Sequence, residues 1–198
     1  RLKCINSSMV SKVLSTVAKM LPEEIESGTE DSLQWFRQNV RDLKIKPIKI
    51  MKGLDTVTNT GLRQGGVYMF HYDAKWKDTL PYWDKYPIVV PLELYNNGFL
   101  GINIHYISPT MRVPLLSKLF EFTMEGEDDD RMLVDYDLTQ IESGLRNAGP
   151  CIKRYLTSHI GARIVKVPRE QWETLMMMPT AQFNVNANTV YADSRRKI

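Results

Sequence analysis

Apolar positions recur at helical spacing in the first part of the chain. Residues 9–21 carry apolar side chains with the 3.6-residue period of a helix, after serines that can cap its N-terminus. Thr29 can cap a second helix, which should end shortly before Pro47 because a residue that precedes proline avoids helical backbone angles. Residues 45–64 mix apolar, basic and turn residues, so we expect an extended arm there. The pattern predicts that 1–64 consists of N-terminal helices and a basic linker.

The period changes from helical to extended in the middle of the chain. Residues 67–72 are aromatic and β-prone. Two further apolar runs flank the turn sequence Asn96-Asn97-Gly98, and we expect residues 88–94 to pair with 99–105 in a hairpin. Strands this close in sequence predict a small antiparallel barrel or a curled sheet.

Helical patterns return after the hairpin. They predict helices at 110–124, 137–147, 150–160 and from Pro168 to Pro179, a candidate strand at 162–167, and an irregular stretch or final strand at 183–191. The predicted fold class is α+β: a small antiparallel β-barrel-like sheet (about 66–107, with 162–167 as a candidate addition) flanked by N-terminal and C-terminal helices. Residues 65–198 are expected to form the α+β core domain as one compact unit.

The composition narrows the class of protein. The 198 residues have the usage of a globular protein, with 43% hydrophobic and 25% charged residues. Two cysteines, Cys4 and Cys151, are too few for a disulfide framework, which favours a reducing compartment. No apolar run reaches the roughly 18 residues of a membrane span. Disordered, membrane and disulfide-scaffold classes are therefore excluded. The chain starts at Arg1 rather than Met, as expected of a fragment or a processed product.

Charge is segregated along the chain, although the net charge is only +3. Residues 37–63 hold seven basic and two acidic residues, and 143–169 hold six basic residues and no acid. Between them, 125–142 hold eight acidic residues and one arginine. Such blocks predict either faces with opposite electrostatic roles or blocks that pair with one another in the fold.

Few residues suggest catalysis. His71 and His105 fall on neighbouring predicted strands, but no third ligand stands at a spacing typical of a metal site. The aspartate run 128–130 lacks the glycine and distal glutamate of a calcium loop, and Cys151 is expected to be a buried structural cysteine. No phosphate loop, dinucleotide fingerprint or nucleophile elbow occurs. A carboxylate pair that meets only in space stays open, but we predict no enzyme, no cofactor and no metal site.

Residues 70–87 interleave aromatic and basic side chains. This composition is typical of sites that stack bases and contact phosphates. The alternative is an ordered loop that closes the sheet, with Asp73, Asp78 and Asp84 pairing its lysines. The candidate partner-binding aromatic residues are Tyr72, Trp76, Tyr82, Trp83 and Tyr86.

A second candidate site is a basic surface that faces DNA phosphates or forms the rim of a protein interface. Several of its members fall near the two helices predicted on either side of Gly149-Pro150. The candidate residues are Arg146, Lys153, Arg154, Arg163, Lys166, Arg169, Arg195, Arg196 and Lys197.

Several strings in the sequence resemble one family of bacteriophage proteins. They are VYMFHYD at 67–73, KDTLPYWDKYP at 77–87, NGFLGINIHY at 97–106, WFR at 35–37, PCIKRYL at 150–156 and YADSRRKI at 191–198. Together they resemble the DNA end-protector, or head-completion, proteins of large contractile-tailed phages of the T-even type. The resemblance covers roughly residues 33–198.

The resemblance implies a non-catalytic virion protein of the head and neck region that completes the head and protects the ends of packaged DNA. It implies assembly in the host cytoplasm, within a symmetric multi-subunit structure that contains portal, neck or tail subunits. The alternative is a baseplate or tail assembly protein that binds only other virion proteins. Double-stranded DNA ends are partners in the first hypothesis and not in the second, and neither hypothesis involves a membrane.

Overall fold

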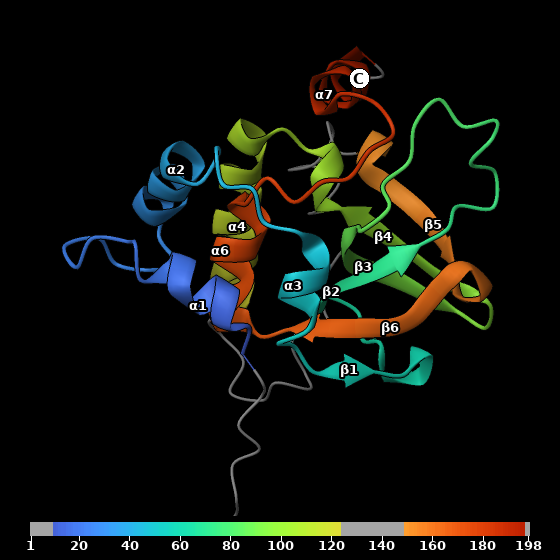
Figure 1. Cartoon of the computed structure of the whole chain (residues 1–198), viewed down its shortest axis with the longest axis horizontal. Coiled ribbons are helices and arrows are strands. Elements are labelled where there is room, and N and C mark those ends of the chain that lie inside the picture. Colours follow the sequence, from blue (N-terminus) through green and yellow to red (C-terminus); the bar gives the residue numbers. More distant parts are fainter. Residues whose placement is uncertain (1–9, 124–148, 197–198) are drawn as a thin grey trace, which may run out of the picture.

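One antiparallel sheet of six strands runs through the residues that the structure describes. The structure is a computed structural model, and it describes residues 10–123 and 149–196. The strands lie side by side in the order β1-β6-β2-β3-β4-β5 (Figure 1). Their bounds are β1 Thr56–Val57, β2 Val67–Tyr72, β3 Ile88–Tyr95, β4 Gly98–Asn103, β5 Ile152–Leu156 and β6 Ile160–Val167.

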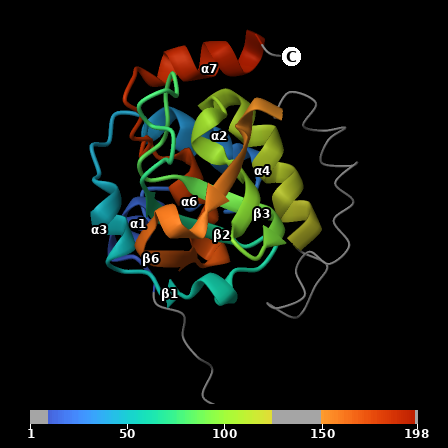
Figure 2. The same ribbon diagram turned by 90° about the vertical axis from the view of Figure 1, so that its right-hand side faces the viewer.

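Helices cover one face of this sheet. Helices α1, α2, α4 and α6 gather on one side in Figure 1, whereas α7 lies at one end of the molecule and β1 at the other in both Figure 1 and Figure 2. The helices are α1 Lys12–Ala18, α2 Glu30–Asn39, α3 Pro47–Met51, α4 Pro109–Thr123, α6 Trp172–Met177 and α7 Ala187–Arg196. Short 3₁₀ turns are η1 Asn59–Gly61, η2 Ile104–Tyr106, η3 Gly149–Cys151, η4 Thr157–His159 and η5 Arg169–Gln171. The predicted α+β class is confirmed.

The sheet curls strongly but does not close. Strands β5 and β6 stand far apart in the strand order, yet only the three residues of η4 connect them. At this end of the sheet the Leu156 amide donates to the Tyr72 hydroxyl at 3.4 Å, and the Asp73 amide donates to the His159 carbonyl at 2.9 Å. No ladder joins β5 to β6, so the predicted barrel-like sheet is an open sheet and not a closed barrel.

The hairpin of β3 and β4 confirms the pairing predicted from the turn sequence. Its register runs from Val89 opposite Asn103 to Tyr95 opposite Gly98, with an irregularity after Pro91. Gly98 has φ +149°, and a Cβ built on it would lie 1.9 Å from the Tyr155 carbonyl oxygen of β5. Glycine is therefore required where the end of β5 runs beside the hairpin turn.

The two faces of the sheet carry different cores. Because side chains alternate along a strand, Val67 and Met69 of β2 face the helices, whereas Tyr68, Phe70 and Tyr72 face the inside of the curl. Inside the curl the rings pack edge to face or stacked, with Phe70 5.9 Å from Phe99 and 5.4 Å from Tyr155 between ring centroids. This aromatic core holds the curled sheet together from within.

A buried arginine joins three helices on the other face. Arg112 of α4 donates through Nε to the Ile107 carbonyl at 2.8 Å and through Nη1 to the Met176 carbonyl at 2.7 Å. Its Nη2 lies 3.3 Å from the Tyr191 hydroxyl of α7. Burial lowers the pKa of this guanidinium. Each of its three nitrogens nevertheless has a carbonyl or hydroxyl acceptor, and these hydrogen bonds tie α4 to α6 and α7.

The N-terminal region differs in part from the prediction. Thr29 does cap α2, where its hydroxyl accepts from the Ser32 amide at 3.2 Å. The expected arm at 45–64 is wrong, however, because α3 buries Ile50 and Met51 in the helix-side core and β1 pairs with β6. The elements of this segment are a five-residue helix and a two-residue strand, which are too short to produce a periodic apolar pattern in the sequence.

Two predictions in the C-terminal half are also wrong. The helix expected at 150–160 is strand β5, which places Tyr155 in the aromatic core while its neighbours remain more exposed. The stretch at 183–191 is expected to be irregular or a strand, but from Ala187 onward it belongs to helix α7. The helix at 110–124, the strand at 162–167 and the helix that ends before Pro179 are confirmed as α4, β6 and α6. The predicted helix at 137–147 and the acidic stretch 125–142 lie outside the described residues.

The aromatic core should dominate the stability of the curled sheet. Phe70→Ala removes a fully buried ring that contacts three others, and we expect it to lower the free energy of unfolding by about 3–5 kcal/mol. Chemical denaturation measures this loss. Leu80→Ala, which trims a side chain that is 42% exposed, is the control and should change the value by less than about 0.5 kcal/mol.

Candidate nucleic-acid interface

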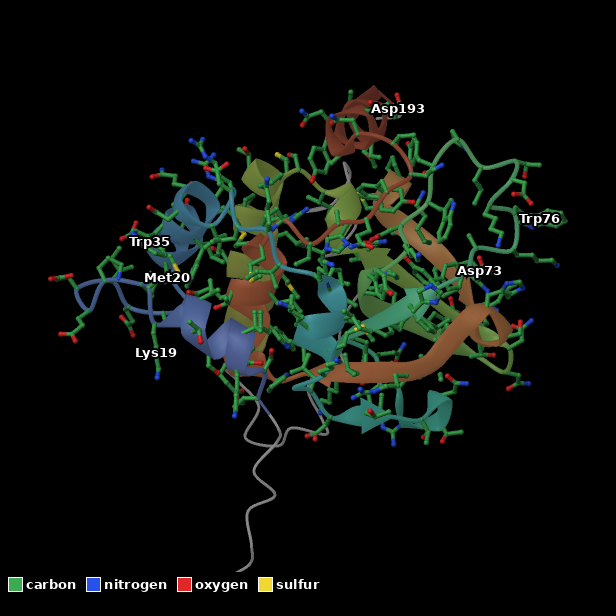
Figure 3. The ribbon with its side chains drawn as sticks, viewed as in Figure 1. Lys19, Met20, Trp35, Asp73, Trp76 and Asp193 are labelled. Atoms are coloured by element: carbon green, nitrogen blue, oxygen red, sulfur yellow. The ribbon has the colours of Figure 1, made fainter. Side chains whose placement is uncertain are left out.

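The loop between β2 and β3, residues 73–87, projects from the body of the molecule at the edge opposite α1 and α2 (Figure 1). Figure 3 shows Trp76 near its outer limit, on the far side from Lys19, Met20 and Trp35. The Trp76 side chain is 62% exposed, and the Lys75 ammonium lies 5.1 Å from the centre of its ring. The tip of this loop therefore presents an indole and neighbouring cations to solvent.

The base of the loop is held by a buried carboxylate. Asp84 is 4% exposed, and its Oδ2 accepts from Asn103 at 3.2 Å and contacts His105 Nδ1 at 2.6 Å. Its Oδ1 accepts from the amides of Tyr86 at 3.2 Å and Gln182 at 3.3 Å. Four donors thus converge on one carboxylate, and they come from the loop, from the end of β4 and from the segment before α7.

The electrostatics of this cluster favour an ionised Asp84. Burial acts to raise the pKa of its carboxyl group. The charge and hydrogen bond of His105, together with the hydrogen bonds from Asn103 and the Gln182 amide, outweigh burial and lower the pKa. His105 Nε2 lies 2.9 Å from the Thr180 hydroxyl, so both ring nitrogens are occupied within the protein. The pair resembles a catalytic dyad in composition, but it is sealed from solvent and serves to join chain segments.

Aromatic rings surround this clamp. Tyr106 lies 5.9 Å from Tyr82 and 5.1 Å from Phe183 between ring centroids, and burial raises the pKa of Tyr106. Lys153 of β5 places its ammonium 4.4 Å above the Tyr106 ring. Lys153 is thereby engaged with the base of the loop.

The predicted aromatic site is therefore divided between core and surface. Tyr72 is buried in the aromatic core, and Tyr82, Trp83 and Tyr86 are half-buried at the base of the loop. Among the five predicted aromatics, Trp76 alone is exposed. Of the carboxylates expected to pair with the loop's lysines, Asp73 does so, with its Oδ1 2.8 Å from Lys77 Nζ, whereas Asp84 binds His105 instead.

The predicted basic surface is also divided. Arg154 of β5 is exposed, with its guanidinium 4.3 Å above the Tyr95 ring, and it donates to the Asn97 side chain and to the Tyr155 carbonyl. It lies at the curled end of the sheet, where η4 connects to Asp73 at the foot of the loop. Arg154 and the loop thus share one end of the molecule.

Arg163 and Lys166 lie on β6, next to α3. The exposed Arg163 donates through Nε to Thr56 Oγ1 at 3.2 Å, and its Nη2 lies 3.4 Å from the Met51 carbonyl. Beside it, three exposed lysines stand at intervals of three residues: Lys49 within α3, and Lys46 and Lys52 at its N-terminal and C-terminal caps. None of the three has a carboxylate oxygen within 4.0 Å among the residues that the structure describes. We call these lysines with Arg163 the α3 basic surface.

Arg163 of the α3 basic surface is among the candidate residues predicted from the sequence, whereas the three lysines are not. The excess of basic residues over 37–63 is the sequence feature that indicates this surface. An extended arm, as expected for 45–64, would not hold those residues together on one face. Of the remaining candidates, Arg169 is half-buried in η5, and Arg195 and Arg196 end α7. Arg146 and Lys197 lie outside the described residues.

A comparison with protein-family models shows to which family the chain belongs. Residues 3–196 match the model of the family described as the phage T4 terminal DNA protecting protein. The chain belongs to this family. No curated protein and no solved structure matches it. The resemblance noted in the sequence is confirmed, and membership of the family extends over its N-terminal residues as well.

The family is described by a protecting role rather than by a reaction, in agreement with the prediction of a non-catalytic phage protein. Within residues 10–123 and 149–196, no three His, Cys, Asp or Glu side chains meet as a metal site would require. Burial raises the pKa of the Cys151 thiol to about 11, which opposes formation of a thiolate nucleophile. No helix in the described part of the chain is long and apolar enough to cross a membrane.

The Asp84 clamp leads to a prediction about pH. The pKa of Asp84 is lower in the folded chain than its ordinary value of 3.8, so its ionised form stabilises the fold above that pH. Asp84→Asn should lower the free energy of unfolding by about 3 kcal/mol at neutral pH, because it disrupts a buried pair. The difference from wild type should shrink as the pH falls below 3.8.

Denaturation of both proteins over a series of pH values measures this difference. Asp78→Asn, in an exposed position of the same loop, is the control. A difference for Asp84→Asn that stays constant down to the most acidic pH would contradict the role assigned to the carboxylate.

Proposed function

We propose that this chain is a non-catalytic virion protein that binds the termini of packaged double-stranded DNA and shields them. The observation that carries the proposal is the match of residues 3–196 to the phage T4 terminal DNA protecting family. We place the protein at the head and neck of the virion, assembled in the host cytoplasm beside portal, neck or tail subunits. The alternative of a baseplate protein that binds only protein is disfavoured, because the description of the family names DNA.

Protection of DNA ends needs a protein that occupies them and does not require catalysis. A nuclease that works from an end must reach the last phosphodiester bonds, so a protein that covers them blocks it stoichiometrically. Such binding draws most of its affinity from cations that neutralise phosphates and release counterions. The exposed cations of the described surface are therefore the first residues to consider.

The α3 basic surface is the best phosphate-binding candidate. Lys49 lies within the short helix α3, and Lys46 and Lys52 cap its two ends. The helix is anchored through Ile50 and Met51 in the core. Phosphate contacts made from such an anchored element position DNA with little loss of backbone freedom on binding. Arg154 lies on another part of the sheet and provides a second point of contact at the curled end.

Exonuclease protection tests the function directly. Linear blunt-ended DNA should become resistant to a double-strand exonuclease that degrades from ends once the purified chain covers both termini. Closed circular DNA, digested with an endonuclease, should gain no such resistance at the same protein concentration. Linear DNA that is degraded at the unprotected rate, with binding sites in excess, would contradict the proposal for this chain.

Charge reversal tests the surface. Lys49→Glu should weaken binding to linear duplex DNA and reduce the slope of log K against log salt by about 0.9, the value for one lost phosphate contact. Lys19→Glu makes the same change of charge at the end of α1 and is the matched control. Equal effects of the two variants would mean that only the net charge matters and that α3 is not the contact.

A further inference from the structure

Recognition of a DNA end poses a specific physical problem. Phosphates are present along the whole duplex, so contacts to them cannot by themselves distinguish a terminus from the interior. A terminus differs because the outer face of its last base pair is uncovered. A flat apolar group that covers that face is therefore one direct means of preferring ends.

Trp76 is such a group. It is the most exposed of the large apolar side chains in the described structure, at 62%, and it lies at the outer limit of its loop (Figure 3). Its neighbours carry charge of the sign that DNA attracts. Lys75 lies against the indole ring, and Lys77, one residue beyond it, is paired with Asp73 at 2.8 Å.

The ring is presented by an ordered turn. The amides of Thr79 and Leu80 donate to the Trp76 carbonyl at 3.0 and 2.9 Å, and the amide of Lys77 donates to the Ala74 carbonyl at 3.1 Å. Ala74 is buried on one side of the tip, and Asp84 is clamped on the other. The backbone that carries Trp76 therefore has little conformational freedom to lose when the ring stacks.

We propose that Trp76 stacks on the outer face of the terminal base pair, with Lys75 directed at the phosphates beside it. The inference rests on the proposed function and adds the basis of end selectivity to it. The Asp84 clamp then has a positioning role, because it holds both the loop and the segment beneath it. The α3 basic surface supplies affinity for duplex DNA of any form, and the loop supplies the preference for an end.

The test compares two DNAs with the full chain. One is a short blunt-ended duplex, and the other is the same duplex closed at both ends by hairpin loops. Wild type should bind the open duplex more tightly. Trp76→Ala should lose about tenfold in affinity for the open duplex, as expected for one lost base stack, and should bind the closed duplex like wild type. Trp76→Phe should retain most of the preference.

Met20→Ala is the matched control, because it removes an apolar side chain that is 46% exposed on the opposite side of the molecule (Figure 3). Its affinities for both DNAs should equal those of wild type. A second measurement places 2-aminopurine in the terminal base pair. Wild type should change its fluorescence on binding, and Trp76→Ala should not.

The outcomes separate the two proposals. If wild type prefers open ends and Trp76→Ala keeps the full preference, the stacking inference is overturned while end binding stands. If Trp76→Ala weakens both DNAs equally, the residue contributes to general binding, and the inference is overturned as well. If wild type shows no preference for open ends, the proposed function fails together with the inference.

Discussion

The buried carboxylate of Asp84 is the interaction on which the functional end of this molecule depends. It gathers donors from three parts of the chain: the projecting loop, the turn that follows β4, and the segment that leads into α7. A buried charge is tolerated only when its partners are complete, and here His105, Asn103 and two backbone amides complete them. Loss of the clamp would release the base of the loop, and with it the position of Trp76.

The curl of the sheet complements this clamp. Because β5 pairs with β4 up to Gly98 and the chain then turns through η4 into β6, the two outer parts of the sheet meet beside the loop. The aromatic core packs buried rings against one another inside the curl. The candidate binding groups lie on the surface of the described structure: the tip of the loop, Arg154 and the α3 basic surface.

Local features of this fold could be predicted from the sequence, whereas most features that depend on long-range contacts could not. The Asn-Gly turn predicted the β3–β4 hairpin, and the Thr29 cap predicted the start of α2, because both signals are complete within a few residues. Strand β5 was mistaken for a helix, since its inward face rests on Tyr155 and only the folded sheet shows what that ring contacts. The basic segment around α3 was mistaken for an arm for a similar reason.

The candidate site could likewise be predicted only where its features are local in the sequence. An aromatic and basic loop was evident from composition, but the sequence does not tell which ring is exposed. Asp84 appeared to be a partner for the loop's lysines, whereas its partners His105 and Gln182 lie far along the chain and meet it only in the fold. The family relationship compensates in part, because it names the ligand that a physical reading of the surface left open.

Footprinting on an end-labelled linear duplex tests the central claim most directly, because it shows where on the DNA the chain sits. With saturating protein and hydroxyl radicals as the cleaving agent, we expect protection that is confined to the terminal base pairs at both ends. The interior of the duplex should be cleaved as in free DNA. Uniform protection along the duplex, or protection of an interior site with exposed ends, would contradict it.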